Sequence, residues 1–362
     1  MAVALQQFLL DRTCRALSFA GVPKLVGRWQ AGCGAILAFH RVYRAGNSEF
    51  GSQAISVSPE DFRGILETLK ERGYTFLSIS GLVDFLAGRR TIDGRVVCLT
   101  FDDGFEDSHS SAFAICKKYR VPMTVYLASG FVTGQFPMWG IGLEAAVAAG
   151  EELVVPIEGE VLRLNCRSVR ARRIAYRTLA SRLAVAHPEE VRRCCESLAL
   201  SHGIDFTVAT NRPVLTPVMI REMRDSGLVE FGAHSVRHAR LACLNSAEAH
   251  WEIARSKSDC EALVGRKIGH FAYPYGDAAA AGEREAAICA ALGFKSAVTT
   301  ESSMIVRSDA ARLFALPRVT FNGRIARDPQ LDLVLSGTLP AARRHWHRAR
   351  AGASRPSRSI SG

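Results

Sequence analysis

The sequence predicts an α/β fold built around a parallel sheet or barrel. Short apolar runs typical of buried strands alternate with segments of helical periodicity, as expected of parallel βα units. Of the 362 residues, 48% are apolar and 22% charged, which is ample for a globular core. This composition excludes a disordered or collagen-like chain, and no stretch approaches the ~18 consecutive apolar residues of a membrane span.

Before residue 134 the chain alternates predicted strands and helices. The strand segments are short and apolar: 35–42, 75–79, 96–101 and 123–128. The helical segments between them are 61–73, 79–88 and 106–120. Residues 1–33, which precede this alternation, are expected to form an amphipathic helical segment that is a packing helix, a tail or a membrane-surface anchor.

The alternation lapses over about 134–216, which we interpret as an insertion. It contains a predicted hairpin at 153–164 and an Arg-rich helical region. Helices at 217–226, 246–264 and 282–292 then alternate with strands at 228–235, 270–276 and 294–300. We therefore expect one catalytic domain over 34–335 that carries this insertion, followed by a basic, disordered tail over 336–362.

Two acidic residues directly follow the predicted strand at 96–101. They lie in Thr100-Phe101-Asp102-Asp103-Gly104. The loops after parallel strands open onto one face of the sheet. Of two adjacent carboxylates at such a position, one can bind a cation while the other accepts a proton. The alternative is an ordinary acidic turn.

Two histidines follow the predicted strand at 228–235, in His234-Ser235-Val236-Arg237-His238. If this segment turns helically, both imidazoles share one face and can meet one ion. One of the two aspartates, together with His234 and His238, would give three ligands with open positions, typical of a catalytic Zn²⁺ site, although Co²⁺ and Ni²⁺ also suit these ligands.

Together, TFDDG and the later HSxxH resemble the polysaccharide deacetylases of carbohydrate esterase family four, the chitooligosaccharide deacetylase group. The resemblance covers about residues 34–134 and 217–320. It implies a distorted (β/α)7 barrel and metal-dependent removal of N-acetyl groups from amino sugars. By the motif match, Asp102 would be the general base and Asp103, His234 and His238 the metal ligands, with a hydrogen bond from Ser235 steadying the loop.

The same resemblance suggests three further residues. The Pro-Tyr motif of the family matches Phe271-Ala272-Tyr273-Pro274-Tyr275-Gly276, so the Tyr275 N–H would bind the oxyanion. The arginine that orients the base in many members is missing from this motif, and Arg318 could supply its charge. The late catalytic histidine is also absent. His40, which resembles the histidine of the exopolysaccharide and biofilm-type branch, is either the general acid or a structural residue.

Three functions remain open at this point. The leading one is N-deacetylation of an amino-sugar polysaccharide, oligosaccharide or lipid-linked precursor. The same site could instead hydrolyse another C–N amide or an O-acetyl ester, or the chain could be a silent glycan-binding homologue. Trp139 either lines a sugar groove or packs in the core.

The net charge of +11 bears on partners and location. Nine arginines lie within 160–193 and six in the tail, which suggests attraction to an anionic membrane surface or a lipid-linked precursor, or plain solubility. Nucleic-acid motifs are absent. Because the N-terminus lacks the features of a signal peptide, we expect a cytoplasmic protein at the inner membrane face.

Overall fold

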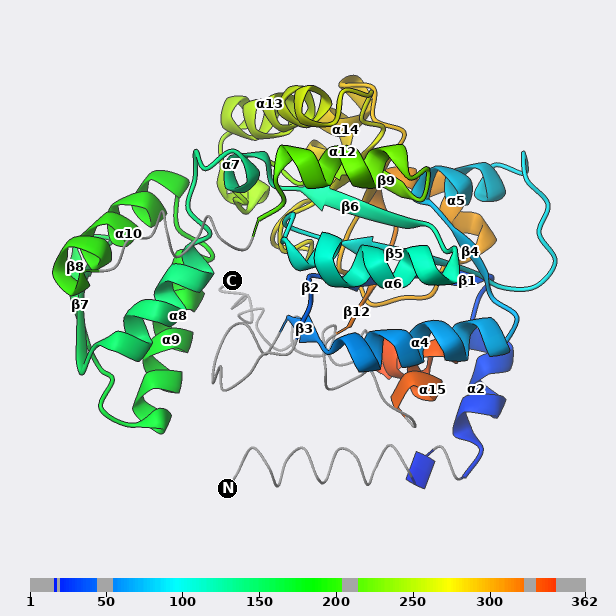
Figure 1. The fold of residues 1–362 in the computed structure, drawn as a ribbon, viewed down its shortest axis with the longest axis horizontal. Helices are drawn as coiled ribbons and strands as arrows, with labels where there is room; N and C mark the ends of the chain where they lie inside the picture. The colour runs from blue at the N-terminus through cyan, green and yellow to red at the C-terminus, as the bar shows by residue number, and fades with distance from the viewer. Residues whose placement is uncertain (1–15, 18–19, 44–54, 204–213, 322–329, 343–362) are drawn as a thin grey trace, which may run out of the picture.

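The computed structural model describes residues 16–17, 20–43, 55–203, 214–321 and 330–342. A curled parallel sheet with helices outside it forms the main body, and the insertion stands beside it as a separate group of elements (Figure 1). The order of strands is β11-β10-β9-β6-β5-β1-β12, with β4 also paired to β5. These strands are β1 (Gly34–Phe39), β4 (Thr75–Leu77), β5 (Val96–Phe101), β6 (Met123–Leu127), β9 (Val229–Ala233), β10 (His270–Ala272), β11 (Ser296–Val298) and β12 (Val319–Thr320).

Strand β5 is where the barrel is distorted. Strand β1 pairs with it along its full length, whereas β4 and β6 share its other edge. Strand β4 takes the beginning of that edge, at Val96, and β6 takes the end, at Thr100. At the far side a parallel bridge joins Val298 of β11 to Leu316, just ahead of β12, so the sheet curls back on itself. The predicted distorted barrel is confirmed.

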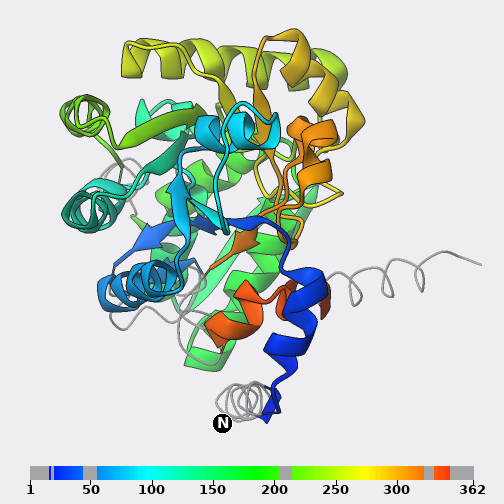
Figure 2. The ribbon, with the colours of Figure 1, turned by 90° about the vertical axis from the view of Figure 1, so that its right-hand side faces the viewer.

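Helices surround the strands (Figures 1 and 2). Several begin at a side chain that accepts a hydrogen bond from the first turn, such as Ser58, Ser78, Thr216 and Asn245. The remaining elements of the main body are α2 (Val22–Gln30), β2 (Arg41–Val42), β3 (Ser56–Val57), α4 (Pro59–Glu71), α5 (Ile79–Leu86), η1 (Ser108–Phe113), α6 (Ala114–Tyr119), α7 (Ser129–Val132), α12 (Pro217–Asp225), η2 (Leu241–Cys243), α13 (Ser246–Val264), α14 (Glu283–Ala291), η3 (Arg307–Ala315) and α15 (Gln330–Leu335). None of the described helices is long and apolar enough to cross a bilayer.

Two predicted elements are interrupted in the structure. The strand predicted over 35–42 ends at Phe39, and after His40 the chain turns to pair Arg41 and Val42 with β3. The helix predicted over 106–120 begins as the π-helix η1 and becomes α6 only at Ala114. Asp107 connects the two deviations, because it accepts hydrogen bonds from Arg41 Nε and Val42 N, both at 2.8 Å. Both interruptions lie beside the candidate site, where π-helical turns are common.

The insertion has its own apolar core. The predicted hairpin is present as the antiparallel pair β7 (Glu152–Ile157) and β8 (Glu160–Asn165). The three helices packed with it are α8 (Trp139–Ala149), α9 (Val169–Leu183) and α10 (Pro188–His202). Buried side chains such as Leu143 and Leu179 hold these elements together. Among the described residues of 1–33, α2 is helical as expected, and most of the tail predicted over 336–362 lies outside them.

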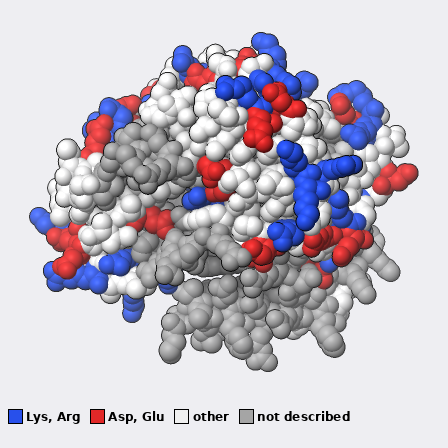
Figure 3. Space-filling view, viewed as in Figure 1, with Lys and Arg blue, Asp and Glu red and all other residues white. Residues whose placement is uncertain are grey.

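The insertion is not the basic surface that its arginines alone suggest. Residues 134–216 contain ten arginines but also nine acidic residues. Within the described part, exposed ion pairs join Arg182 to Glu160, Arg192 to Glu189 and Glu196, and Arg193 to Glu190. The visible face of the insertion accordingly mixes both signs of charge (Figure 3). The six tail arginines lie outside the described residues.

Candidate metal centre and active site

The two carboxylates after β5 point to different partners because of an unusual turn. Asp103 and Gly104 are both left-handed, with φ of 74° and 82°. Only glycine suits the second position, because an added Cβ at Gly104 would lie 2.9 Å from Val132 Cγ2. The turn directs Asp102 to Arg318 and Asp103 to the histidines of the loop after β9.

The loop that carries His234 and His238 is not helical, so the helical turn considered from the sequence is not what brings the two imidazoles together. Ser235 and His238 instead adopt left-handed φ values of 60° and 52°, which brings the two imidazoles to a centroid separation of 4.9 Å. Four of the six left-handed non-glycine residues in the described chain lie at this site: Asp103, Ser235, His238 and Tyr275. Such conformations are costly and collect at functional sites.

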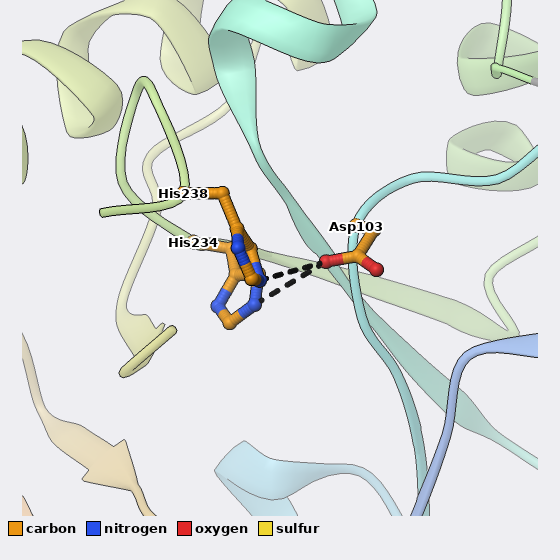
Figure 4. Close-up of side chains that lie close together, drawn as sticks. All are labelled: Asp103, His234 and His238. Atoms are coloured by element: carbon orange, nitrogen blue, oxygen red, sulfur yellow. Dashed lines mark ion pairs between the residues drawn. The ribbon is translucent and has the colours of Figure 1, made fainter. Parts of the chain in front are cut away.

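Asp103, His234 and His238 converge on one point (Figure 4). The Oδ1 atom of Asp103 lies 3.5 Å from His234 Nε2 and 3.3 Å from His238 Nε2, and the three candidate ligand atoms are all within 4.8 Å of one another. His234 Nδ1 donates to the Ala272 carbonyl at 2.7 Å, so in the neutral ring the lone pair is on Nε2, which faces Asp103. Asp103 Oδ1 is buried and has no hydrogen-bond partner among the described residues.

These donors fit a divalent cation. Electron pairs that face one another in a buried site repel unless a proton or a metal ion lies between them. Burial lowers the pKa of His238 to about 4, despite the opposing effect of Asp103, so this imidazole is neutral at pH 7. Burial also opposes the charged form of Asp103, but His238 and His234 hold the pKa of that carboxyl well below its usual range. One carboxylate and two imidazoles match the ligand set of a catalytic zinc site.

Glu252 organises the histidine loop from behind, and sequence reasoning missed it. Its carboxylate is fully buried and accepts hydrogen bonds from Val236 N at 2.8 Å, Arg237 N at 3.0 Å and Arg237 Nε at 2.6 Å. The available signal was a carboxylate on the apolar face of the predicted helix 246–264. Ser235 does not play the part expected of it, because its buried hydroxyl has no hydrogen-bond partner among the described residues.

Asp102 forms a buried, bidentate ion pair with Arg318. Arg318 Nη1 and Nη2 each lie 2.8 Å from one carboxylate oxygen, and the arginine side chain is fully buried. Burial raises the pKa of Asp102, but the charge and hydrogen bonds of Arg318, together with the charges of His234 and His40, more than offset it, so the pKa lies below its ordinary value. Arg318, which directly precedes β12, is thus placed to orient Asp102, the predicted general base.

The remaining predicted residues line a cavity of about 400 Å³ over this cluster. His40 and Tyr275 both border it, together with Asp102, Asp103 and His234. His40 Nδ1 is buried and unpartnered among the described residues. The Tyr275 N–H likewise donates no hydrogen bond within the described chain, while Tyr275 O accepts one from Thr300 at 2.6 Å.

The insertion closes the other side of the cavity, which the sequence analysis did not foresee beyond Trp139. Met138, Trp139, Ile141 and Glu144 come from the start of α8 and the residue before it, and Tyr176 comes from α9. Trp139 therefore borders the cavity and also packs against the core of the insertion.

Comparisons with known proteins agree with this geometry. Two solved structures share the fold at 19% identity: the deacetylase PplD of Streptococcus pyogenes, in complex with acetate, and IcaB from Ammonifex degensii. The first match has a TM-score of 0.56 and covers 83% of this chain and 96% of that one. The second has a TM-score of 0.54 and covers 85% and 98%.

Sequence comparisons give one curated relative and one family model. A curated relative named "Putative polysaccharide deacetylase YxkH", from Bacillus subtilis, is 27% identical over 92 residues, which is 25% of this chain and only 30% of that protein. The family model for polysaccharide deacetylase matches residues 89–296, more than half of the chain, and spans both TFDDG and HSxxH. The chain therefore belongs to the polysaccharide deacetylase family of hydrolases.

Proposed function

We propose that this protein is a metal-dependent deacetylase that removes N-acetyl groups from amino sugars of a glycan. The observation that carries the proposal is the convergence of Asp103 Oδ1, which is buried and has no hydrogen-bond partner in the described part of the chain, with two histidine nitrogens beside the Asp102–Arg318 pair. Asp103, His234 and His238 would hold the ion. A divalent cation bound there supplies Lewis acidity for the acetamide carbonyl and lowers the pKa of water toward ~7.

Asp102 would act as the general base. Its carboxylate borders the cavity and takes the proton of the attacking water, while the bidentate contact with Arg318 fixes its orientation. The backbone N–H of Tyr275 would donate to the acetyl carbonyl oxygen as it becomes an oxyanion, and removal of one such donor typically costs ~10²-fold or more in rate.

His40 would protonate the leaving amine. It borders the same cavity as Asp102, and its Nδ1 has no protein partner to compete for the proton among the described residues. The turn after His40 is fixed by Asp107, whose carboxylate receives Arg41 Nε and Val42 N. An amine leaves poorly unless protonated, whereas an alcohol leaves more easily, so His40 supports an amide substrate over an O-acetyl ester.

The test is acetate release by the zinc-loaded or cobalt-loaded full chain from N-acetylated chitooligosaccharides, with acetylated xylan alongside. We expect release from the former, and loss of both activity and bound metal in Asp103→Asn and His234→Ala. Asp84→Asn is the matched control, since this half-exposed carboxylate on α5 forms an ion pair with Arg89, away from the candidate site. Release from xylan alone would establish an O-acetyl esterase, and unchanged metal content in both site variants would refute the metal site.

A lipid-linked precursor and a place at the inner membrane face remain predictions. The balanced charge of the insertion leaves the tail arginines as their main support. Acetate release from a lipid-linked N-acetylated glycan in anionic vesicles, compared with the free glycan, would test both.

A further inference from the structure

The cavity over the metal centre has one wall that comes from the barrel and one that comes from the insertion. We infer that the insertion wall is a binding subsite for the sugar next to the acetylated one, so that the protein selects oligosaccharides over single N-acetylated sugars. This inference rests on the proposed function, because it concerns the substrate of the same cavity. The wall consists of Met138, Trp139, Gly140, Ile141, Glu144 and Tyr176.

Trp139 supplies the flat apolar surface of this subsite. It is the first residue of α8, and its half-buried ring is backed by the apolar core of the insertion. It borders the main cavity and also a small second cavity that reaches His238 and Tyr275, so the residue lies between the insertion and the histidine loop. A fixed aromatic face next to a hydrolytic centre suits the apolar face of a pyranose ring.

Glu144 and Tyr176 add hydrogen-bonding groups to an otherwise apolar wall. Burial, with a further contribution from Glu144, raises the pKa of Tyr176 to about 12, so its hydroxyl stays protonated and can donate. The Glu144 carboxylate can accept a hydrogen bond from a sugar hydroxyl. Sugar hydroxyls both donate and accept, and a few placed polar groups on an apolar surface are typical of specific ligand sites.

Gly140 leaves room in front of Tyr176. A Cβ added at this position would have only one neighbour within 4 Å, the Tyr176 hydroxyl at 3.8 Å. A large side chain there would therefore occupy the subsite without striking the backbone. The insertion is also joined to the histidine loop, because Arg237 Nη1 of that loop lies 3.2 Å from Glu189 Oε1 of α10.

The experiment compares a long and a short substrate. Trp139→Ala should raise KM for N-acetylated chitotetraose about tenfold, the effect of losing one aromatic stacking contact, with kcat changed less than about twofold. Its kcat/KM for 4-nitrophenyl acetate, which is too small to span both walls, should fall much less than its kcat/KM for the tetramer. Trp139→Phe should recover most of the lost affinity, and Gly140→Phe should raise KM for the tetramer selectively. Trp29→Ala is the control, since that indole is 84% exposed on α2.

Binding measured without turnover separates the two proposals. Calorimetric titration of the tetramer into zinc-loaded Asp102→Asn, with and without Trp139→Ala, reads the subsite alone. Equal affinity in both, or an equal loss of Trp139→Ala activity on the tetramer and on the small ester, would overturn the subsite while acetate release upholds the function. Tryptophan-dependent binding without acetate release from any glycan would uphold the subsite and reject the proposed catalysis. Absence of tetramer binding would reject the subsite.

Discussion

The two walls of the cavity are held in place by different forces. On the barrel side, buried polar groups are paired with one another: Arg318 forms an ion pair with Asp102, and Glu252 accepts hydrogen bonds from the histidine loop. On the insertion side, an apolar core positions the lining residues, and its ion pairs are exposed. A buried ion pair fixes the orientation of its side chains, and removing one partner is strongly destabilising. Apolar packing tolerates substitutions that keep the volume of the side chain. The residues proposed for catalysis therefore lie on the barrel, and those proposed for substrate contact lie on the insertion.

The largest effect is expected from Arg318→Met. It leaves Asp102 buried without its partner, which should lower the free energy of unfolding by about 3–5 kcal/mol. It should also raise the pKa of Asp102, because the guanidinium holds that pKa below its ordinary value. The acid limb of the kcat/KM profile should therefore move to higher pH.

Urea unfolding from pH 3 to 8 checks the linkage. A carboxyl whose pKa is depressed by folding stabilises the protein above its unfolded pKa, ~3.9, and this stabilisation is lost as pH falls through the folded pKa. The unmodified chain should lose that contribution on acidification, and the Met variant should lack it throughout. Arg89→Met removes an exposed pair with Asp84 and should cost under about 1 kcal/mol. Equal losses in the two variants would contradict the assignment.

The next largest effect is expected inside the insertion. Leu179→Ala empties a fully buried position of its core and should cost about 2–5 kcal/mol of local stability. Thermal unfolding and limited proteolysis should show loosening of 134–216, while zinc content and turnover of 4-nitrophenyl acetate persist. Leu200→Ala, at a position 87% exposed on α10, is the matched control. Loss of zinc in Leu179→Ala would show that the two walls are not separable.

The smallest effect is expected behind the histidine loop. Glu252→Gln turns an acceptor of three hydrogen bonds into a poorer one and should weaken zinc binding about 10- to 100-fold. Competition with a chromophoric chelator measures the affinity. Glu261→Gln, on the same helix but bonded to Ile268 N, should leave it unchanged. A matching loss in both variants would mean that α13 acts through general stability.

Much of the barrel could be predicted because its strands are continuous apolar runs. Val96–Phe101 is buried at every position, which is why its boundaries are readable from sequence. The sharing of one β5 edge by β4 and β6 could not be read, because register depends on which strands meet in space. The π-helical start of the segment at Ser108 could not be predicted either. It directly follows Asp107, whose side chain contacts the turn after His40.

The candidate site divides in the same way. Asp102, Asp103, His234 and His238 could be named in advance because each follows a strand that could be recognised. The ion pair of Arg318 with Asp102 joins residues 216 positions apart, and only the closing of the sheet brings them together. Glu252 could be noticed as a carboxylate on the apolar face of a predicted helix, but the sequence does not show that it accepts hydrogen bonds from two backbone N–H groups.

By itself, then, the sequence determined the alternation of strands and helices, the family, and the residue types able to hold a cation, since these depend on local pattern and chemistry. The tertiary structure decided that an arginine fixes Asp102, that left-handed residues rather than a helical turn bring the histidines together, and that the insertion closes the cavity. These features depend on contacts between segments far apart in the chain, and local pattern does not encode such contacts.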